Sequence, residues 1–339
     1  MLTSALILAT CGPAAPSPPR RATPTHRTRP PKPRNTVRPD VLPIPEDHGA
    51  IRLDLARLRR TAVYRKVRPH LIALLARKKH RSRLAYERTK RCGFDLERDV
   101  MTLSIAIDLR ESTKPEIVVV RTRVDAQRLL RCLAGQTQPP FAHKRIHLGP
   151  LRGVAWYEKG SLTGEVLVLD KHRLVWMGPR SRVAVREVLT GSRRSLASTL
   201  LYRAIRGSQT SAPMAMAVLP VLQEAKPGQP LPFIADLLAL GIGVDLPRGG
   251  LRLRGLVPCG KTETANTLVR MMPMMGAMLA KKSPAYAPVL RKLKLTLDSD
   301  DPTAVRVALD LSGAEVAPLL VLLDKTLKAK PGSKPPSRP

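Results

Sequence analysis

The sequence predicts an α+β fold built from antiparallel hairpins that are each followed by a helix. The stretch Val100–Gly135 has the pattern of two strands and then a helix, and the same order returns three more times along the chain. The turns inside the hairpins are short, which permits only antiparallel pairing. We therefore expect an antiparallel sheet with the helices packed on one face.

The first unit shows the pattern most clearly. Apolar residues alternate from Met101 to Leu109, a turn-rich segment covers Glu111–Glu116, and β-branched residues fill Ile117–Val124. Asp125 is suited to cap the following helix, because its carboxylate can accept the free amides of a first turn. Leucines at helical spacing then lead to Gly135, where we expect the helix to end.

Weaker patterns flank this unit in the first half of the chain. A short strand over Ile51–Leu55 precedes helical spacing that Pro69 interrupts. After the unit we expect strands over Leu151–Lys159 and Gly164–Gly178, around short loops at Lys159–Thr163 and Asp170–His172, and then helices at Arg180–Leu189 and Ser195–Ile205.

The second half repeats the order twice. Its first pass has strands Leu238–Leu246 and Leu251–Val257 with a helix Glu263–Met272, and a further strand, Ala212–Leu219, precedes it. The last pass has strands Leu293–Leu297 and Ala304–Leu311 with a helix Ala314–Leu327. These repetitions suggest one α+β domain over residues 46–328, divided into two similar halves at 46–210 and 211–328.

Both ends of the chain are poor in core-forming residues. Residues 13–45 hold 11 of the 33 prolines and 7 Lys or Arg against one acid, and residues 329–339 are mostly Lys, Pro and Ser. Proline removes an amide donor and like charges repel each other. We expect a disordered tether at 13–45 and a disordered basic tail at 329–339.

The net charge of +33 is spread over the chain. From Arg52 to Arg91 there are 15 Lys or Arg and only two acids, and Arg77–Arg91 is the densest part. A field of this kind attracts polyanions, whether nucleic acid, anionic lipid or an acidic surface polymer. The alternative is a solvated surface that reflects composition alone. Aromatic residues make up only 3% of the chain, which disfavours a stacking platform for single-stranded nucleic acid.

The N-terminus contains a candidate lipidation site. Leu8-Ala9-Thr10-Cys11 resembles the lipobox of bacterial lipoproteins, in which the cysteine becomes the acylated N-terminal residue. Residues 1–12 would then be the signal, although they lack a basic start and Thr10 occupies a position where the lipobox has a smaller residue. The alternative is a cytoplasmic protein with a plain tail.

Three cysteines remain besides Cys11. In an oxidising compartment they allow one disulfide, and we favour Cys92 with Cys132, because these two residues flank the central hairpin. The alternative is three small buried thiols, with Cys259 as the third.

One stretch matches a nucleotide-binding motif. Gly255 to Thr262 satisfies G-x-x-x-x-G-K-[ST], so Gly255, Gly260, Lys261 and Thr262 are the alternative phosphate-binding residues. In such a loop the preceding strand is central and parallel, with a nearly continuous apolar sequence. Here Leu251-Arg-Leu-Arg254 alternates and follows a four-residue turn, which favours a helix-capping turn instead.

Other catalytic patterns are absent from the sequence, so we expect no catalytic residues, no cofactor and no metal. His143 and His147 are four residues apart but lie between Pro140 and Gly149 without a third ligand, and the acids at Asp298–Asp301 suit a hairpin turn.

Several strings together resemble the uncharacterised putative lipoproteins of bacteria. They are Cys11 with its proline-rich tether, Arg91–Asp95 before a strand, Val118–Asp125 before a helix, and Val305–Leu327. The resemblance implies a module on the bacterial surface or in the periplasm and brings no catalytic residues. We therefore expect a non-enzymatic, lipid-anchored extracytoplasmic binding or structural module whose basic surface contacts anionic envelope components. A cytoplasmic nucleotide-binding protein and a nucleic-acid-binding protein are the alternatives.

Overall fold

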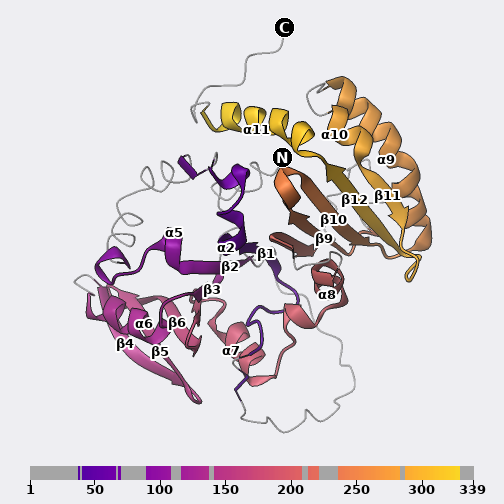
Figure 1. Ribbon diagram of the computed structural model, residues 1–339. Coiled ribbons are helices and arrows are strands. Elements are labelled where there is room, and N and C mark those ends of the chain that lie inside the picture. The colour runs from indigo at the N-terminus through magenta and orange to yellow at the C-terminus, as the bar shows by residue number, and fades with distance from the viewer. Residues whose placement is uncertain are drawn as a thin grey trace, which may run out of the picture.

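A computed structural model describes residues 37–38, 40–65, 68–69, 89–107, 116–136, 141–207, 213–220, 236–282 and 287–328. The described strands form one twelve-stranded antiparallel sheet with the order β11-β12-β10-β9-β8-β1-β2-β3-β7-β6-β5-β4 (Figure 1). The predicted α+β class is confirmed. Cys11 and residues 70–88, which include most of the predicted basic helix, lie outside the described residues.

Among the described residues, the first half of the chain supplies seven strands. One of them, β1, lies in the middle of the whole sheet and pairs with both β2 and β8. The seven are β1 (Gly49–Asp54), β2 (Val100–Ile107), β3 (Ile117–Thr122), β4 (Phe141–Leu148), β5 (Leu151–Glu158), β6 (Ser161–Asp170) and β7 (Arg173–Met177). The second half supplies β8 (Ala215–Pro220), β9 (Ala239–Asp245), β10 (Leu251–Pro258), β11 (Lys294–Leu297) and β12 (Ala304–Leu311).

Helices form in each of the five ranges that the sequence predicts after Val100, whereas the short helices at Leu96–Asp99 and Ala287–Lys292 are not predicted. The described helices are α2 (Leu55–Leu58), α5 (Leu96–Asp99), α6 (Ala126–Gly135), α7 (Arg182–Thr190), α8 (Leu200–Gly207), α9 (Thr262–Lys282), α10 (Ala287–Lys292) and α11 (Gly313–Lys328), with 3₁₀ turns η2 (Leu196–Ser198) and η4 (Pro247–Gly249). Helix α9 continues past Pro273 to Lys282, whereas the sequence predicts an end near Met272.

Each predicted hairpin forms in the structure. β2 pairs with β3, β6 with β7, β9 with β10, and β11 with β12, all antiparallel. Outward from the β1–β8 pair, the order β2-β3-β7-β6 on one side corresponds to β9-β10-β12-β11 on the other, and the β4–β5 hairpin extends only the first side. The two similar halves stay a prediction, since this correspondence concerns pairing order alone.

The prediction that all helices pack on one face of the sheet is wrong. On β6, Val166 and Val168 pack in a cluster with α6, whereas Leu167 and Leu169 belong to the main core with α7. Successive strand residues point to opposite faces, so α6 and α7 cover opposite faces of β6. The physical reason is the run of six buried residues from Gly164 to Leu169, which leaves neither face of this strand open to water.

The predicted tether is too long at its C-terminal end. Ile44 is fully buried in the main core, and Leu42 packs against the same core. The segment is held by main-chain bonds, because the amide of Arg38 donates to the Leu189 carbonyl and the amide of Leu196 donates to the Ile44 carbonyl, both at 2.8 Å. Prolines 43 and 45 lack amides to satisfy, and the apolar residues between and before them supply the packing.

The sequence prediction also omits β4. The segment Phe141–Leu148 pairs along its whole length with β5, and Gly149 with positive φ lies in the turn between them. His143 and His147 are therefore four residues apart along an extended strand, which is two strand repeats, and not on successive turns of a helix.

Candidate functional site

Helix α6 lies beside β4 and β5 at one end of the sheet (Figure 1). It forms the first wall of a groove. Asp125 caps it by accepting the amide of Arg128 at 2.8 Å, as the sequence predicts. Ala126, Leu130 and Ala134 on the helix pack against Val154 of β5 and the valines of β6. This packing leaves Arg131 on the flank of the helix that faces β4.

The second wall is the outer hairpin. Across the β4–β5 pair, Arg145 lies opposite Val154 and His147 lies opposite Arg152. Directly paired residues share a face of the sheet, and Val154 is covered by α6. Arg145, His147 and Arg152 therefore lie on the face that carries α6, and the two-residue period adds His143 to them.

Together these walls enclose a groove of about 600 Å³. Its floor is apolar, with Leu130, Val154 and Val168. Its polar lining consists of Gln127 and five basic residues, Arg131, His143, Arg145, His147 and Arg152, and no acidic side chain of the described residues lines it. We call this site the cationic groove.

The arginines of the cationic groove differ from others in the protein. On the opposite face of β6, Glu165 is 3% exposed and pairs with Arg186 at 2.7 Å, and near β7 Arg173 pairs with Asp170 at 2.6 Å. Within the described part of the chain, Arg131, Arg145 and Arg152 form no such ion pair with a carboxylate. Their guanidinium groups are therefore available to an anionic ligand.

The electrostatics of α6 are consistent with a positive surrounding field. The pKa of Asp125 is lowered, first by the hydrogen bond from the Arg128 amide and further by the charges of Lys171 and Arg131. Of these two cations, only Arg131 lines the cationic groove.

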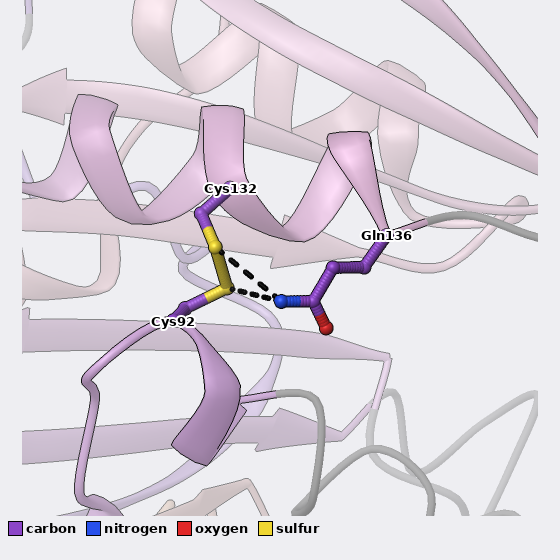
Figure 2. Close-up of a disulfide and its surroundings, with 3 residues drawn as sticks. All are labelled: Cys92, Cys132 and Gln136. Atoms are coloured by element: carbon purple, nitrogen blue, oxygen red, sulfur yellow. Dashed lines mark hydrogen bonds between the residues drawn. A yellow bond between two sulfur atoms is a disulfide. The ribbon is translucent and has the colours of Figure 1, made fainter.

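A disulfide holds α6 in place. Cys92 is bonded to Cys132 on α6, which is the pair that the sequence favours (Figure 2). The side-chain amide of Gln136 donates to both sulfur atoms, at 3.3 and 3.5 Å. Leu129 of the helix and Phe94 beyond Cys92 pack in one cluster, so the crosslink joins segments that also share a small core. Cys259 is a free buried thiol whose pKa is raised, chiefly by burial.

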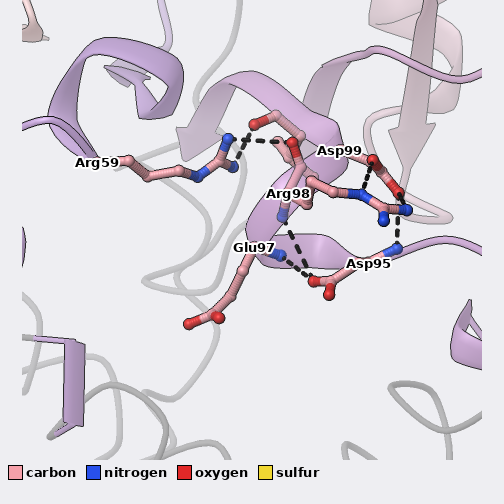
Figure 3. A network of polar contacts seen from close by, with 6 residues as sticks. Arg59, Asp95, Glu97, Arg98 and Asp99 are labelled. Atoms are coloured by element: carbon pink, nitrogen blue, oxygen red, sulfur yellow. Dashed lines mark hydrogen bonds and ion pairs between the residues drawn. The ribbon is translucent and has the colours of Figure 1, made fainter.

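The turn that follows Cys92 is stabilised by its own polar network (Figure 3). Asp95 caps α5 by accepting the amide of Glu97 at 2.8 Å, and the Asp99 carboxylate accepts the amide of Asp95 at 2.8 Å. The hydrogen bond from Arg98 to Asp99 is the main cause of the lowered pKa of Asp99. Arg59 donates to the carbonyl of Arg98, which ties this turn to the end of α2. These arginines have protein partners and act in structure.

The alternative phosphate-binding site is not formed. Gly255 lies within β10, which pairs antiparallel with β9 on one side and β12 on the other. A Cβ atom at Gly255 would lie 3.0 Å from the Gly241 carbonyl oxygen, so this glycine permits close strand approach. A phosphate cradle requires a parallel strand that ends in free amides, and β10 does not provide one.

The residues after β10 are also engaged. The Gly260 amide donates to the Asp236 carbonyl at 2.6 Å, and Lys261 lies 3.5 Å from the Asp236 carboxylate. Thr264 donates to the same carboxylate at 2.8 Å, and this hydrogen bond is the first cause of the lowered pKa of Asp236. Thr262 begins α9. The motif thus builds the start of a helix, as the alternating strand before it indicates.

The structure brings together residues that sequence reasoning considered separately or not at all. At helical spacing, the sequence pattern suggests His143 and His147 only as metal ligands, and it gives no reason to select Arg131, Arg145 or Arg152. Across the described ranges, no three His, Cys, Asp or Glu side chains gather as a metal site would require. The sequence does contain a signal for a strand with one basic face, because His143, Arg145 and His147 are spaced two residues apart just before a short turn.

No protein-family model matches the chain, and no curated protein matches it. Three crystal structures of TP0453 are similar in chain path, with 8–9% sequence identity and a TM-score of 0.44. They cover 82–84% of this chain and 93–98% of their own. This degree of similarity carries no argument about function. No helix within the described ranges is long and apolar enough to span a membrane.

Proposed function

We propose that the protein is a non-enzymatic binding module, tethered to the bacterial envelope through lipidated Cys11, that contacts anionic envelope components with its basic surface. The observation that carries the proposal is the cationic groove. Three arginines and two histidines line one hollow, and within the described residues none of these arginines forms an ion pair with a carboxylate. Guanidinium groups in this state bind phosphate or carboxylate groups with paired hydrogen bonds.

The extracytoplasmic location is supported by two independent features. The lipobox-like sequence ends at Cys11, and the proline-rich residues after it are suited to a tether. The Cys92–Cys132 disulfide is a type of bond that forms and persists in oxidising compartments. Together these features favour an anchored envelope protein over a cytoplasmic one.

Lipidation is tested by labelling cells with a radioactive fatty acid and comparing the wild type with Cys11→Ser. We expect label in the wild type and none in the variant. Equal label in both would contradict the anchoring part of the proposal and leave anion binding to be judged separately.

Anion binding is tested by titrating the protein with inorganic polyphosphate and with vesicles that contain anionic phospholipid. We expect binding that weakens steeply as salt rises, because occupied cations release counterions from the polyanion. Binding that is insensitive to salt, or no binding to either probe, would contradict the proposed contact. Tighter binding to a DNA duplex than to both probes would favour a nucleic-acid partner instead.

A further inference from the structure

The strand that forms the outer wall of the cationic groove is also the last strand of the sheet. Within the described residues, β4 pairs with β5 and with no other strand. In a strand that is paired on one side only, the N–H and C=O groups of alternate residues point away from the sheet. The outer side of β4 is therefore an open edge that can accept a further strand.

The two faces of β4 differ in chemistry. His143, Arg145 and His147 lie on the groove face, and residues two apart in a strand are separated by about 6.8 Å. On the other face, Ile146 and Leu148 pack against the main core. The edge thus presents a row of nitrogen-containing basic groups on one face, and Lys144 beside the apolar side chains of Ile146 and Leu148 on the opposite face.

We propose that β4 docks an extended acidic segment of a partner polypeptide, which adds to the sheet as a strand. Its acidic residues, at every second position, would lie opposite His143, Arg145 and His147, and the apolar residues between them would lie beside Ile146 and Leu148. This inference rests on the proposed anion binding and names the partner as a polypeptide. Only a polypeptide can satisfy both the charged face and the open main-chain groups.

The geometry of a sheet makes the charge matching local. Residues directly opposite each other on neighbouring strands have Cβ atoms about 4.5–5.5 Å apart, close enough for side-chain ion pairs. Arg152, opposite His147 on β5, and Arg131 on α6 add positive charge behind the row. An acidic strand at the edge therefore meets cations from three elements.

The same charges select against a second copy of this protein. Two β4 strands placed edge to edge would bring two rows of basic residues together, and like charges on paired strands are unfavourable. Charged residues on edge strands commonly prevent such self-association. An acidic partner turns this repulsion into attraction, so the edge discriminates between a second copy and an acidic segment.

The direct test uses the full-length oxidised protein and two labelled peptides of identical composition, half Glu and half Val, each matching the eight residues of β4 in length. One peptide alternates Glu and Val, and the other has them in two blocks. By fluorescence anisotropy we expect the alternating peptide to bind about tenfold more tightly, because only it aligns its acids on one face. Equal affinities would overturn the strand-addition proposal.

Two further peptides separate main-chain pairing from charge. Each is the alternating peptide with N-methyl groups on alternate amides, and the two versions block opposite edges of the peptide. We expect one version to lose binding and the other to keep it, since a strand offers one edge to β4. If both versions bind as well as the unmodified peptide, the proposal is wrong.

Matched variants locate the site on the protein. Arg145→Gln removes a cation from the groove face, and Lys144→Gln removes one from the same strand on the other face. We expect Arg145→Gln to weaken the alternating peptide about three- to tenfold and Lys144→Gln to change it less than twofold. Equal effects would contradict the assigned face. Polyphosphate binding distinguishes strand addition from the proposed anion binding. If the protein binds polyphosphate but binds the alternating and block peptides equally, anion binding stands and strand addition is wrong. If it binds neither polyphosphate nor the peptides, both proposals are wrong.

Discussion

Arg145 on β4 lies directly opposite Val154 on β5, and Val154 is buried under helix α6. The pairing places a guanidinium group beside an apolar floor at the rim of the sheet. Arg145 is exposed, and it forms no ion pair with a carboxylate within the described residues. Its guanidinium group can therefore bind an anionic ligand with paired hydrogen bonds.

The disulfide should contribute measurably to stability. Reduction of Cys92–Cys132, which are separated by 40 residues, is expected to lower the free energy of unfolding by about 2–4 kcal/mol. Urea unfolding with and without reductant measures this change. The double variant Cys92→Ser, Cys132→Ser is the control, because reductant should leave its midpoint unchanged. A urea midpoint of the wild type that does not change with reductant would contradict the crosslink.

The segment before residue 46 should behave as part of the folded core. Ile44→Ala is expected to cost about 2–5 kcal/mol, because the side chain is fully buried and its removal leaves a cavity. Leu200, which is 78% exposed, provides the control, and Leu200→Ala should change stability by less than about 0.5 kcal/mol. Chemical unfolding of both variants makes the comparison. If both variants lose the same small amount of unfolding free energy, the burial of Ile44 is contradicted and the longer tether that the sequence predicts is supported.

Acid should weaken the start of α11 through Glu315. Its carboxylate accepts hydrogen bonds from the Ser312 amide and hydroxyl and pairs with Lys292, and the pKa falls from 4.5 to about 2, with Lys292 as the first cause. A lowered folded-state pKa means that the stabilisation is present above pH 4.5 and is lost as pH falls through about 2.

Glu315→Gln tests this assignment, because glutamine keeps the size of the side chain and cannot titrate. We expect the wild type to lose stability relative to the variant between pH 4.5 and pH 2. Urea midpoints measured across this range give the difference. Parallel pH profiles for the two proteins would show that Glu315 makes no such contribution.

Lys261 should have no role in nucleotide binding. Lys261→Ala removes an exposed cation that lies near Asp236, so its effect on Mg-ATP binding should equal that of removing another exposed cation. Arg270→Gln, on the helix that follows Lys261, is the comparison. Calorimetric titration with Mg-ATP should give equally weak affinities for the two variants. Saturable Mg-ATP binding by the wild type that Lys261→Ala abolishes and Arg270→Gln does not would support the phosphate-binding site.

Much of the fold follows from local pattern. Alternation and short turns predict the hairpins β2–β3, β9–β10 and β11–β12, and Asp125 predicts the start of α6, because these signals depend on neighbouring residues. The predicted helix layers are wrong, although the apolar run Val166–Leu169 indicates a strand covered on both faces. Prolines 43 and 45 suggested disorder, while Ile44 between them is decisive for packing.

The cationic groove could not be predicted in the same way. Arg131 comes from α6, Arg145 from β4 and Arg152 from β5, and only strand register and helix packing bring them together. His143 and His147 share a face at helical spacing and at strand spacing alike, because four residues make about one helical turn and two strand repeats. Once Phe141–Leu148 is known to be a strand, the row of His143, Arg145 and His147 on one face follows.

The most direct measurement compares polyphosphate binding by two triple variants with equal loss of charge. The first is Arg131→Gln, Arg145→Gln, Arg152→Gln in the groove, and the second is Lys144→Gln, Arg203→Gln, Arg270→Gln at exposed positions elsewhere. If the groove binds anions, the first variant should lose at least about tenfold in affinity with a smaller salt slope, and the second should stay close to the wild type. Equal losses in both would show that net charge alone accounts for binding and would contradict the proposed site.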